Sequence, residues 1–358
     1  MKHHDDWDEA FHYQERKDQR KDRKHARNKD RSQFKKSDID QKRKRQSSIE
    51  IPTENLSEGR VLAILPEGIV VDHEGKEILC TLKGTLKQQN LRTKNLVAVG
   101  DFVLFKPDGA IEHVKERRSV LSRADNLSRR KEQLIAVNID QVLITCSLLL
   151  PPLKPSLIDR YIIAAQKGNM RPIIVINKID LLEEEMHPFF DDFVQTYRSL
   201  GIPVFPLSTM TNEGIDALKE EMQGKASVVS GQSGVGKTSL INAITGSNLP
   251  IGDVIEQTLK GSHTTTSARL LPLEGGGFCI DTPGIRSFGM WDLKKDEIES
   301  YFPEIFEIGL NCRYPDCRHI EEPDCAVKLA LEEGKISPLR FDSYCALIET
   351  LELEHKPR

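Results

Sequence analysis

At 358 residues, the chain is long enough to form two or three domains with ordinary hydrophobic cores. Its net charge of -4 hides an asymmetry, because residues 1–50 carry 16 Lys and Arg against 11 Asp and Glu while the remainder is acidic. The charged start is unlike a signal peptide and no apolar run is long enough to span a bilayer, so we expect a cytoplasmic protein with no membrane partner.

Residues 1–50 form a charged arm. They are rich in Lys, Arg, Asp and His and show almost no apolar periodicity, so we predict that they are disordered. A basic arm on an acidic body suggests a polyanionic partner. The alternative is a solvated tail without a partner.

Residues 51–118 read as a small β domain. Short β-type runs are expected at 59–65, 68–73, 77–82, 99–105 and 110–114, separated by turn residues. Five strands in this length fit an OB-type barrel, which is a common platform for oligonucleotides. Four basic residues lie in a connecting stretch where they would meet phosphate: Lys83, Lys87, Arg92 and Lys94.

Residues 119–291 alternate between strand and helix patterns. Buried strands are expected at 141–149, 171–177, 202–208 and 226–231, and helices at 156–168, 187–201 and 214–222. Such alternation predicts a parallel sheet with helices on both faces.

The motif GQSGVGKT at 231–238 matches G-x-x-x-x-G-K-[ST] and lies between a strand pattern and a helix pattern. Backbone N–H groups of such a loop bind phosphates, Lys237 would reach the β- and γ-oxygens, and the Thr238 hydroxyl would bind Mg²⁺. The predicted phosphate-binding residues are Gly231, Gln232, Ser233, Gly234, Val235, Gly236, Lys237, Thr238 and Ser239.

The motif NKID at 177–180 follows an apolar strand pattern and suits guanine. The Asp180 carboxylate would accept two hydrogen bonds from the base, Asn177 would support the loop, and the Lys178 stem would cover the ring. Ile179 completes the motif, and Ser208 and Thr209 would back the base from another loop. The aspartate argues against the rival interpretation of an ATP-driven nucleic-acid enzyme.

The motif DTPG at 281–284 supplies the remaining contacts to the triphosphate. Asp281 would hold Mg²⁺ through water, and the Gly284 N–H would meet the γ-phosphate. Of the threonines at 264–266, we expect Thr265 to bind Mg²⁺ together with Thr238. An ordinary polar loop is the alternative for these threonines.

The order of these motifs is unusual. GTPases normally run from phosphate loop to threonine switch, D-x-x-G and then N-K-x-D, whereas here N-K-x-D comes first. The order indicates a circular permutation, which compact domains tolerate because their termini often lie close together.

Residues 292–358 contain a Cys/His knuckle of pattern C-x₄-C-x-H-x₅-C, formed by Cys312, Cys317, His319 and Cys325. Four soft ligands in this spacing predict one structural Zn²⁺. The alternative is a set of unligated thiols; three other cysteines lie in strand-like runs, which favours a reducing compartment. Two helices separated by a Ser-Pro break follow, and Arg313, Arg318 and Lys328 are candidates for RNA contact.

Taken in order, NKID, GQSGVGKTSLIN, HTTT, DTPGI and the knuckle resemble the small-ribosomal-subunit-dependent GTPase A family (RsgA, also called YjeQ) over roughly residues 56–350. The resemblance implies three folded parts: an OB-type barrel, a circularly permuted α/β P-loop GTPase and a zinc-binding helical domain. It also implies a GTP hydrolase that uses Mg²⁺ and acts late in small-subunit maturation. In such a protein the barrel and the zinc domain bind ribosomal RNA. We expect a monomer.

Fewer sequence features identify the residues that catalyse hydrolysis than identify those that bind the nucleotide. Ile285 stands where Ras-like enzymes place the Gln that orients water, so intrinsic hydrolysis should be slow. Gly234 stands where an Asn would recruit K⁺, which argues against that activation. His263 is the nearest side chain able to position water, so the predicted catalytic set is His263, Lys237 and Thr265. An exposed loop histidine is the alternative, and a GTP-gated RNA-binding scaffold with vestigial hydrolysis is the alternative function.

Overall fold

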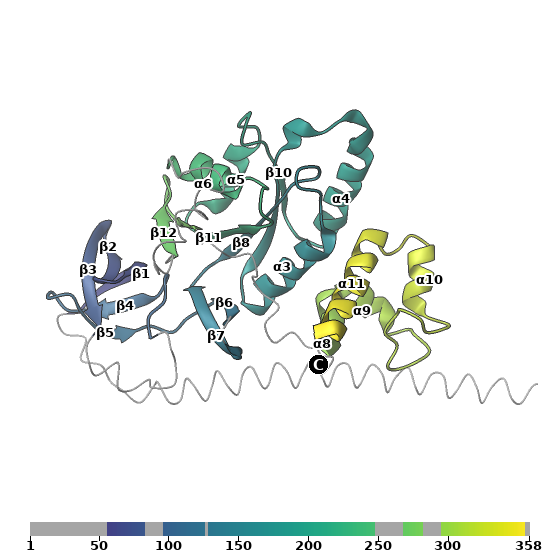
Figure 1. Cartoon of the computed structure of the whole chain (residues 1–358), viewed down its shortest axis with the longest axis horizontal. Helices are drawn as coiled ribbons and strands as arrows, with labels where there is room; N and C mark the ends of the chain where they lie inside the picture. Colours follow the sequence, from purple (N-terminus) through teal and green to yellow (C-terminus); the bar gives the residue numbers. More distant parts are fainter. Residues whose placement is uncertain (1–55, 83–95, 126–127, 248–267, 282–294, 355–358) are drawn as a thin grey trace, which may run out of the picture. The chain divides into compact units, whose positions relative to one another are not determined.

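The structure is a computed structural model that describes residues 56–82, 96–125, 128–247, 268–281 and 295–354. The chain forms two compact units. The larger unit spans Asn55–Asp292, and the described part of the C-terminal unit is 295–354. Figure 1 shows the strands of the larger unit in purple to green and the helices of the C-terminal unit in yellow.

Five strands at the start of the larger unit close into a barrel. They are β1 (Ser57–Leu65), β2 (Gly68–His73), β3 (Lys76–Leu82), β4 (Phe102–Phe105) and β5 (Ala110–Val114). The order is β1-β2-β3-β5-β4, and β4 pairs back onto β1. Only the β3–β5 pair is parallel among these neighbours. Alternate residues such as Val61, Val71, Val103 and Ile111 fill the interior. The five predicted strands are therefore present.

The second part of the larger unit is a mainly parallel sheet of order β10-β9-β8-β11-β13-β12. Its strands are β8 (Gln141–Cys146), β9 (Arg171–Ile176), β10 (Val204–Pro206), β11 (Ala226–Gly231), β12 (Arg269–Pro272) and β13 (Phe278–Asp281). Only β12 runs antiparallel to its neighbour in this part. The carboxyl ends of the five parallel strands therefore meet at one edge of the sheet.

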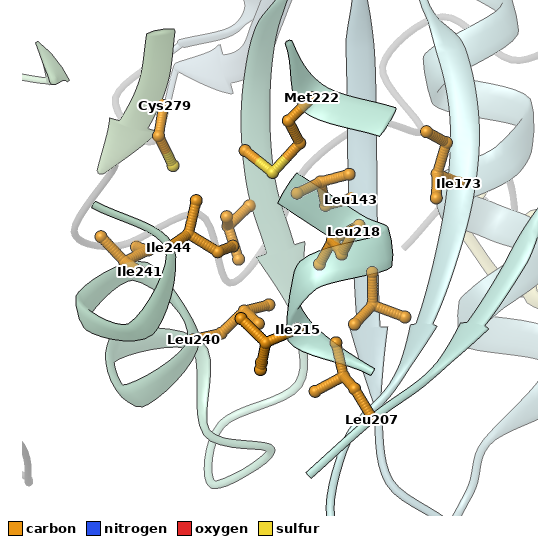
Figure 2. Close-up of a cluster of buried hydrophobic side chains, with 12 residues drawn as sticks. Leu143, Ile173, Leu207, Ile215, Leu218, Met222, Leu240, Ile241, Ile244 and Cys279 are labelled. Atoms are coloured by element: carbon orange, nitrogen blue, oxygen red, sulfur yellow. The ribbon is translucent and has the colours of Figure 1, made fainter. Parts of the chain in front are cut away.

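Helices cover both faces of this sheet, as predicted. They are α3 (Pro155–Lys167), α4 (His187–Ser199), α5 (Ile215–Met222) and α6 (Lys237–Thr245). Figure 2 shows α5 and α6 packing Leu218, Leu240 and Ile244 against Leu143 and neighbouring strand residues. Because side chains alternate along a strand, Ile144 points to the opposite face, where it borders α3. Short 3₁₀ turns, η1 (Ile179–Leu181) and η2 (Glu184–Met186), follow β9.

The barrel joins the central sheet directly, because β1 also pairs with β12 through Ala63 and Arg269. The Arg60 guanidinium lies 5.1 Å from the ring of Phe102 in the barrel and 4.8 Å from that of Phe278 on β13. It also donates a 2.7 Å hydrogen bond to the Asn138 carbonyl oxygen. The guanidinium thus connects both parts of the unit.

A hairpin of β6 (Val120–Asp125) and β7 (Ser128–Val137) lies between the barrel and the sheet in the sequence. The sequence patterns do not predict this hairpin. The segment 122–133 is rich in charged residues and lacks the apolar alternation that marks a half-buried strand.

The described part of the C-terminal unit is helical. It contains α8 (Lys295–Ile298), η3 (Glu299–Tyr301), α9 (Pro303–Gly309), α10 (Ala326–Glu332) and α11 (Pro338–Glu354). Phe302, Ile305, Tyr344 and Leu347 are buried in its core. The break between α10 and α11 falls at the predicted Ser-Pro step. Among the helices of the described ranges, none is both long and apolar enough to cross a membrane.

Candidate nucleotide and metal sites

Two predicted motifs meet at the carboxyl edge of the parallel sheet. The phosphate-loop motif follows β11 and NKID follows β9, with β8 between them. The register pairs Gly231 with Thr145 on β8, and Cys146 with Ile176 on β9. Open α/β sheets bind ligands at this edge.

The glycines of the phosphate loop have conformations and surroundings that a side chain would not fit. Gly234 and Gly236 have φ of 84° and 90°, in the left-handed region. A Cβ on Gly231 would overlap the carbonyl oxygen of Thr145, and one on Gly236 would lie 2.5 Å from the Asn177 amide nitrogen. The phosphate loop can therefore lie directly against β8 and against the NKID segment at 177–180, the base loop.

Helix α6 begins at Lys237, with Gly236 as its N-cap. The first N–H groups of a helix have no partner within the helix and favour an anion. The Lys237 ammonium donates to the carbonyl oxygens of Gly231 at 3.0 Å and Gln232 at 2.7 Å, so the cation stays within the loop. Thr238 and Ser239, in the first turn, are half-buried, whereas Ser233 is exposed.

Asn177 connects the base loop to the phosphate loop. Its side-chain amide donates to the Val235 carbonyl oxygen at 2.9 Å, across 58 residues of sequence. Its Oδ1 accepts from the backbone N–H groups of Lys178 at 2.8 Å and Thr209 at 3.1 Å. With only 1% of the residue exposed, Asn177 makes three bonds that fix three loops together.

Lys178 adds a second connection. Its backbone is left-handed, with φ of 67°. Its ammonium donates to the carbonyl oxygens of Leu150 at 2.6 Å and Gly234 at 2.7 Å. The Leu150 contact ties the loop after β8 to the same site. No sequence signal identified it, because the acceptor is a backbone carbonyl.

Asp180 lies at the exposed end of this site. Its Oδ1 accepts a hydrogen bond from the buried Ser208 hydroxyl, whose oxygen accepts from the N–H groups of Met210 and Thr211, both at 3.2 Å. This network orients the carboxylate. Ile179 donates its N–H to the Leu207 carbonyl oxygen at 3.3 Å, which holds the turn against β10.

The remaining nucleotide motifs are only partly described. Asp281 ends β13, which runs parallel to β11 with Val228 opposite Ile280. The backbone of Asp281 therefore ends beside the strand that leads to the phosphate loop. The other predicted residues of this set lie outside the described residues: His263, Thr264, Thr265, Thr266, Gly284 and Ile285.

The four residues of the Cys/His knuckle converge in the C-terminal unit. All are buried, and their ligand atoms lie within 4.8 Å of one another. His319 Nδ1 lies 3.4 Å from Cys312 Sγ, 3.4 Å from Cys317 Sγ and 3.3 Å from Cys325 Sγ. Cys312 Sγ and Cys325 Sγ are 3.8 Å apart.

These separations fit a tetrahedral zinc site. With Zn–S of about 2.3 Å and Zn–N of about 2.0 Å, tetrahedral geometry places sulfur and nitrogen about 3.5 Å apart and two sulfurs about 3.8 Å apart. The cluster comes close to both values. Its three sulfurs and one imidazole nitrogen are also donors that Zn²⁺ prefers.

Charge in the cluster is unevenly shared. A hydrogen bond with Cys325, together with His319, lowers the pKa of Cys312. Burial raises the pKa of Cys317, and the charge on Cys312 contributes to that rise. The Cys312 thiolate therefore forms more readily than the other two, and a bound divalent cation would favour the thiolate form of all three.

Comparison with known proteins gives a consistent result. The RsgA GTPase family profile matches residues 114–291. A small ribosomal subunit biogenesis GTPase RsgA from Bacteroides fragilis is 37% identical over 285 residues, covering 78% of this chain and 92% of the relative. The protein of the same name from Yersinia pseudotuberculosis is 39% identical over 307 residues, covering 82% and 87%.

Two solved structures are also similar. YjeQ from Thermotoga maritima has a TM-score of 0.69 and 32% identity, covering 84% of this chain and 100% of that one. YloQ, described as a circularly permuted GTPase, has a TM-score of 0.66 and 28% identity, covering 87% and 100%.

Proposed function

The chain belongs to the RsgA GTPase family and is a GTP hydrolase, and on that premise we propose that it binds the small ribosomal subunit and assists its late maturation. The name shared by its relatives supports this role. The observation that carries the GTP-binding part of the proposal is the arrangement at the sheet edge. At this edge the Asn177 side chain donates a hydrogen bond to Val235, which holds the NKID motif against the phosphate loop. The phosphate loop comes later in the chain than NKID, as in a circularly permuted GTPase.

We propose that Asp180 recognises the guanine base by accepting hydrogen bonds from it. Its exposed carboxylate is oriented through Oδ1 by Ser208, and Oδ2 has no hydrogen-bond partner among the described residues. Guanine offers two donors on one edge, which a carboxylate can accept and which adenine lacks. The Lys178 stem would cover the ring while its ammonium holds the loops.

The phosphates would lie at the N-terminus of α6, where Lys237 and the loop N–H groups supply positive charge. Mg²⁺, when bound with GTP, neutralises charge that develops on the phosphate oxygens. Thr238 and Thr265 would supply hydroxyl ligands to it, and Asp281 a contact through water. Gly284 would donate its N–H to the γ-phosphate.

Hydrolysis requires a correctly placed water. Ile285 cannot orient one, so we propose that His263 does so when the subunit is bound. Turnover in the free protein would then be slow and stimulated by the small subunit.

We propose one structural Zn²⁺ at Cys312, Cys317, His319 and Cys325. Four protein ligands in a buried cluster leave no open position for substrate, which is the arrangement of a structural site. Metal binding would hold the loops around α9 and α10 together.

The RNA contacts are proposed from fold and charge. We propose that the barrel is of the OB type and that its Lys83, Lys87, Arg92 and Lys94, outside the described residues, contact ribosomal RNA. In the C-terminal unit, Arg313, Arg318 and Lys328 are the candidates, although Arg313 pairs with Asp324 at 2.7 Å. We further propose domain limits of 51–118, 119–291 and 292–358, a cytoplasmic location and a monomeric state.

Cosedimentation with purified ribosomal subunits tests the proposed partner. We expect the chain to sediment with small subunits in a non-hydrolysable GTP analogue, less in GDP, and not with large subunits. A chain lacking residues 1–50 controls for non-specific binding of the basic arm to RNA, which falls steeply with salt. Equal sedimentation with both subunits, or with neither, contradicts the proposal.

A further inference from the structure

Glu299 contacts the metal-ligand cluster without being one of its four ligands. It begins η3, and its carboxylate Oε1 lies 3.1 Å from Nε2 of His319. The other ring nitrogen, Nδ1, is the one that faces the three sulfurs. The two nitrogens of one imidazole therefore have separate partners, the ligand cluster on one side and a carboxylate on the other.

We propose that Glu299 is a positioning residue for the zinc site, which holds His319 in the tautomer that presents Nδ1 to the metal. This inference rests on the proposed structural Zn²⁺. A carboxylate accepts a hydrogen bond but cannot donate one, so it requires the proton on Nε2 and leaves the Nδ1 lone pair for the metal. Accepting that proton also makes the imidazole a stronger ligand.

Burial and close packing around His319 and Glu299 favour this hydrogen bond. His319 is fully buried, so an Nε2–H without an acceptor would be costly. Its backbone is left-handed, with φ of 68°. A Cβ added at Gly309 would lie 2.7 Å from Glu299 Oε1 and 3.0 Å from His319 Nε2, so the glycine at the end of α9 admits both side chains.

The contact between Glu299 and His319 joins two parts of the C-terminal unit that are separate in the sequence. Glu299 precedes the first cysteine ligand, and the chain between it and Cys312 includes α9. The hydrogen bond thus joins the start of the C-terminal unit to the cluster at the centre of the knuckle. Zinc binding should therefore stabilise η3 and α9 as well as the knuckle itself.

The test compares three variants of the full chain. Glu299→Ala removes the acceptor, Glu299→Gln keeps a carbonyl oxygen without the charge, and Glu307→Gln removes an exposed carboxylate from α9 as the matched control. Zinc affinity is measured by competition with a chromophoric chelator. We expect a 10- to 100-fold loss for the alanine variant, a smaller loss for Glu299→Gln, and none for the control.

A second readout distinguishes positioning from general stability. Nitrogen-15 NMR of the labelled histidines in the zinc-loaded protein should show Nδ1 bound to metal and Nε2 protonated in the parent and in Glu299→Gln. Zinc affinity of Glu299→Ala within threefold of the parent, or metal on Nε2 in the parent, overturns the role of Glu299. A parent protein that binds no stoichiometric zinc instead overturns the proposed zinc site.

Discussion

Asn177 offers the sharpest test of how the nucleotide site is built. Replacing it with alanine removes three hydrogen bonds at once, to the Val235 carbonyl oxygen and from the N–H groups of Lys178 and Thr209. At roughly 1 kcal/mol each, their loss amounts to about 3 kcal/mol. Since 1.4 kcal/mol corresponds to a factor of ten, GTP affinity should fall by up to about 100-fold if the whole cost falls on the binding site.

The cost of the lost hydrogen bonds can appear as weaker GTP binding or as a lower free energy of unfolding. Isothermal titration with GTP measures the first, and urea denaturation of the nucleotide-free protein measures the second. We expect the largest part in GTP affinity, because the three bonds join loops that hold the base and the phosphates. Gln166→Ala, which removes an exposed amide from α3, should change neither quantity. If Asn177→Ala binds GTP within threefold of the parent, the bridge does not organise the site.

Four further outcomes are expected. Asp180→Asn should weaken GTP binding by about 2–3 kcal/mol and admit xanthine nucleotides, and unchanged guanine preference in a competition assay would contradict its role. Cys317→Ser should lose zinc by metal analysis and unfold the C-terminal unit while GTP binding survives; an ordered, metal-free unit would argue against structural zinc. Arg60→Ala should lower the free energy of unfolding by about 1–2 kcal/mol, through lost stacking on two aromatic rings, whereas an unchanged urea midpoint would show that the barrel junction does not depend on it. His263→Ala should abolish stimulation by small subunits at nearly unchanged GTP affinity; a variant stimulated as well as the parent would remove histidine from the mechanism.

Local patterns in the sequence were enough to predict most of the elements. The run ASVVSG became a strand with all six residues buried, and the helix predicted to end at Gly168 has that residue as its C-cap. These predictions depend on periodicity, apolar runs and glycine placement, which are properties of neighbouring residues. The cysteine spacing likewise predicted which side chains would converge.

Contacts that depend on distant residues could not be predicted this way. Lys178 bonds to the Leu150 carbonyl oxygen, and any residue at position 150 supplies a carbonyl. Glu299 lies 20 residues before His319, outside the spacing of the knuckle. The hairpin of β6 and β7 was not predicted, because its strands are defined by their pairing with each other and not by an apolar pattern.

Steady-state GTP hydrolysis with purified small and large ribosomal subunits tests the central claim most directly. We predict slow turnover by the free protein, a strong increase with small subunits and no increase with large subunits. Asp180→Asn should transfer the same stimulation from GTP to xanthosine triphosphate, which would assign the activity to this chain and not to a contaminant. Turnover that stays slow with small subunits, although the chain cosediments with them, would contradict a subunit-stimulated GTPase and favour a GTP-gated RNA-binding scaffold.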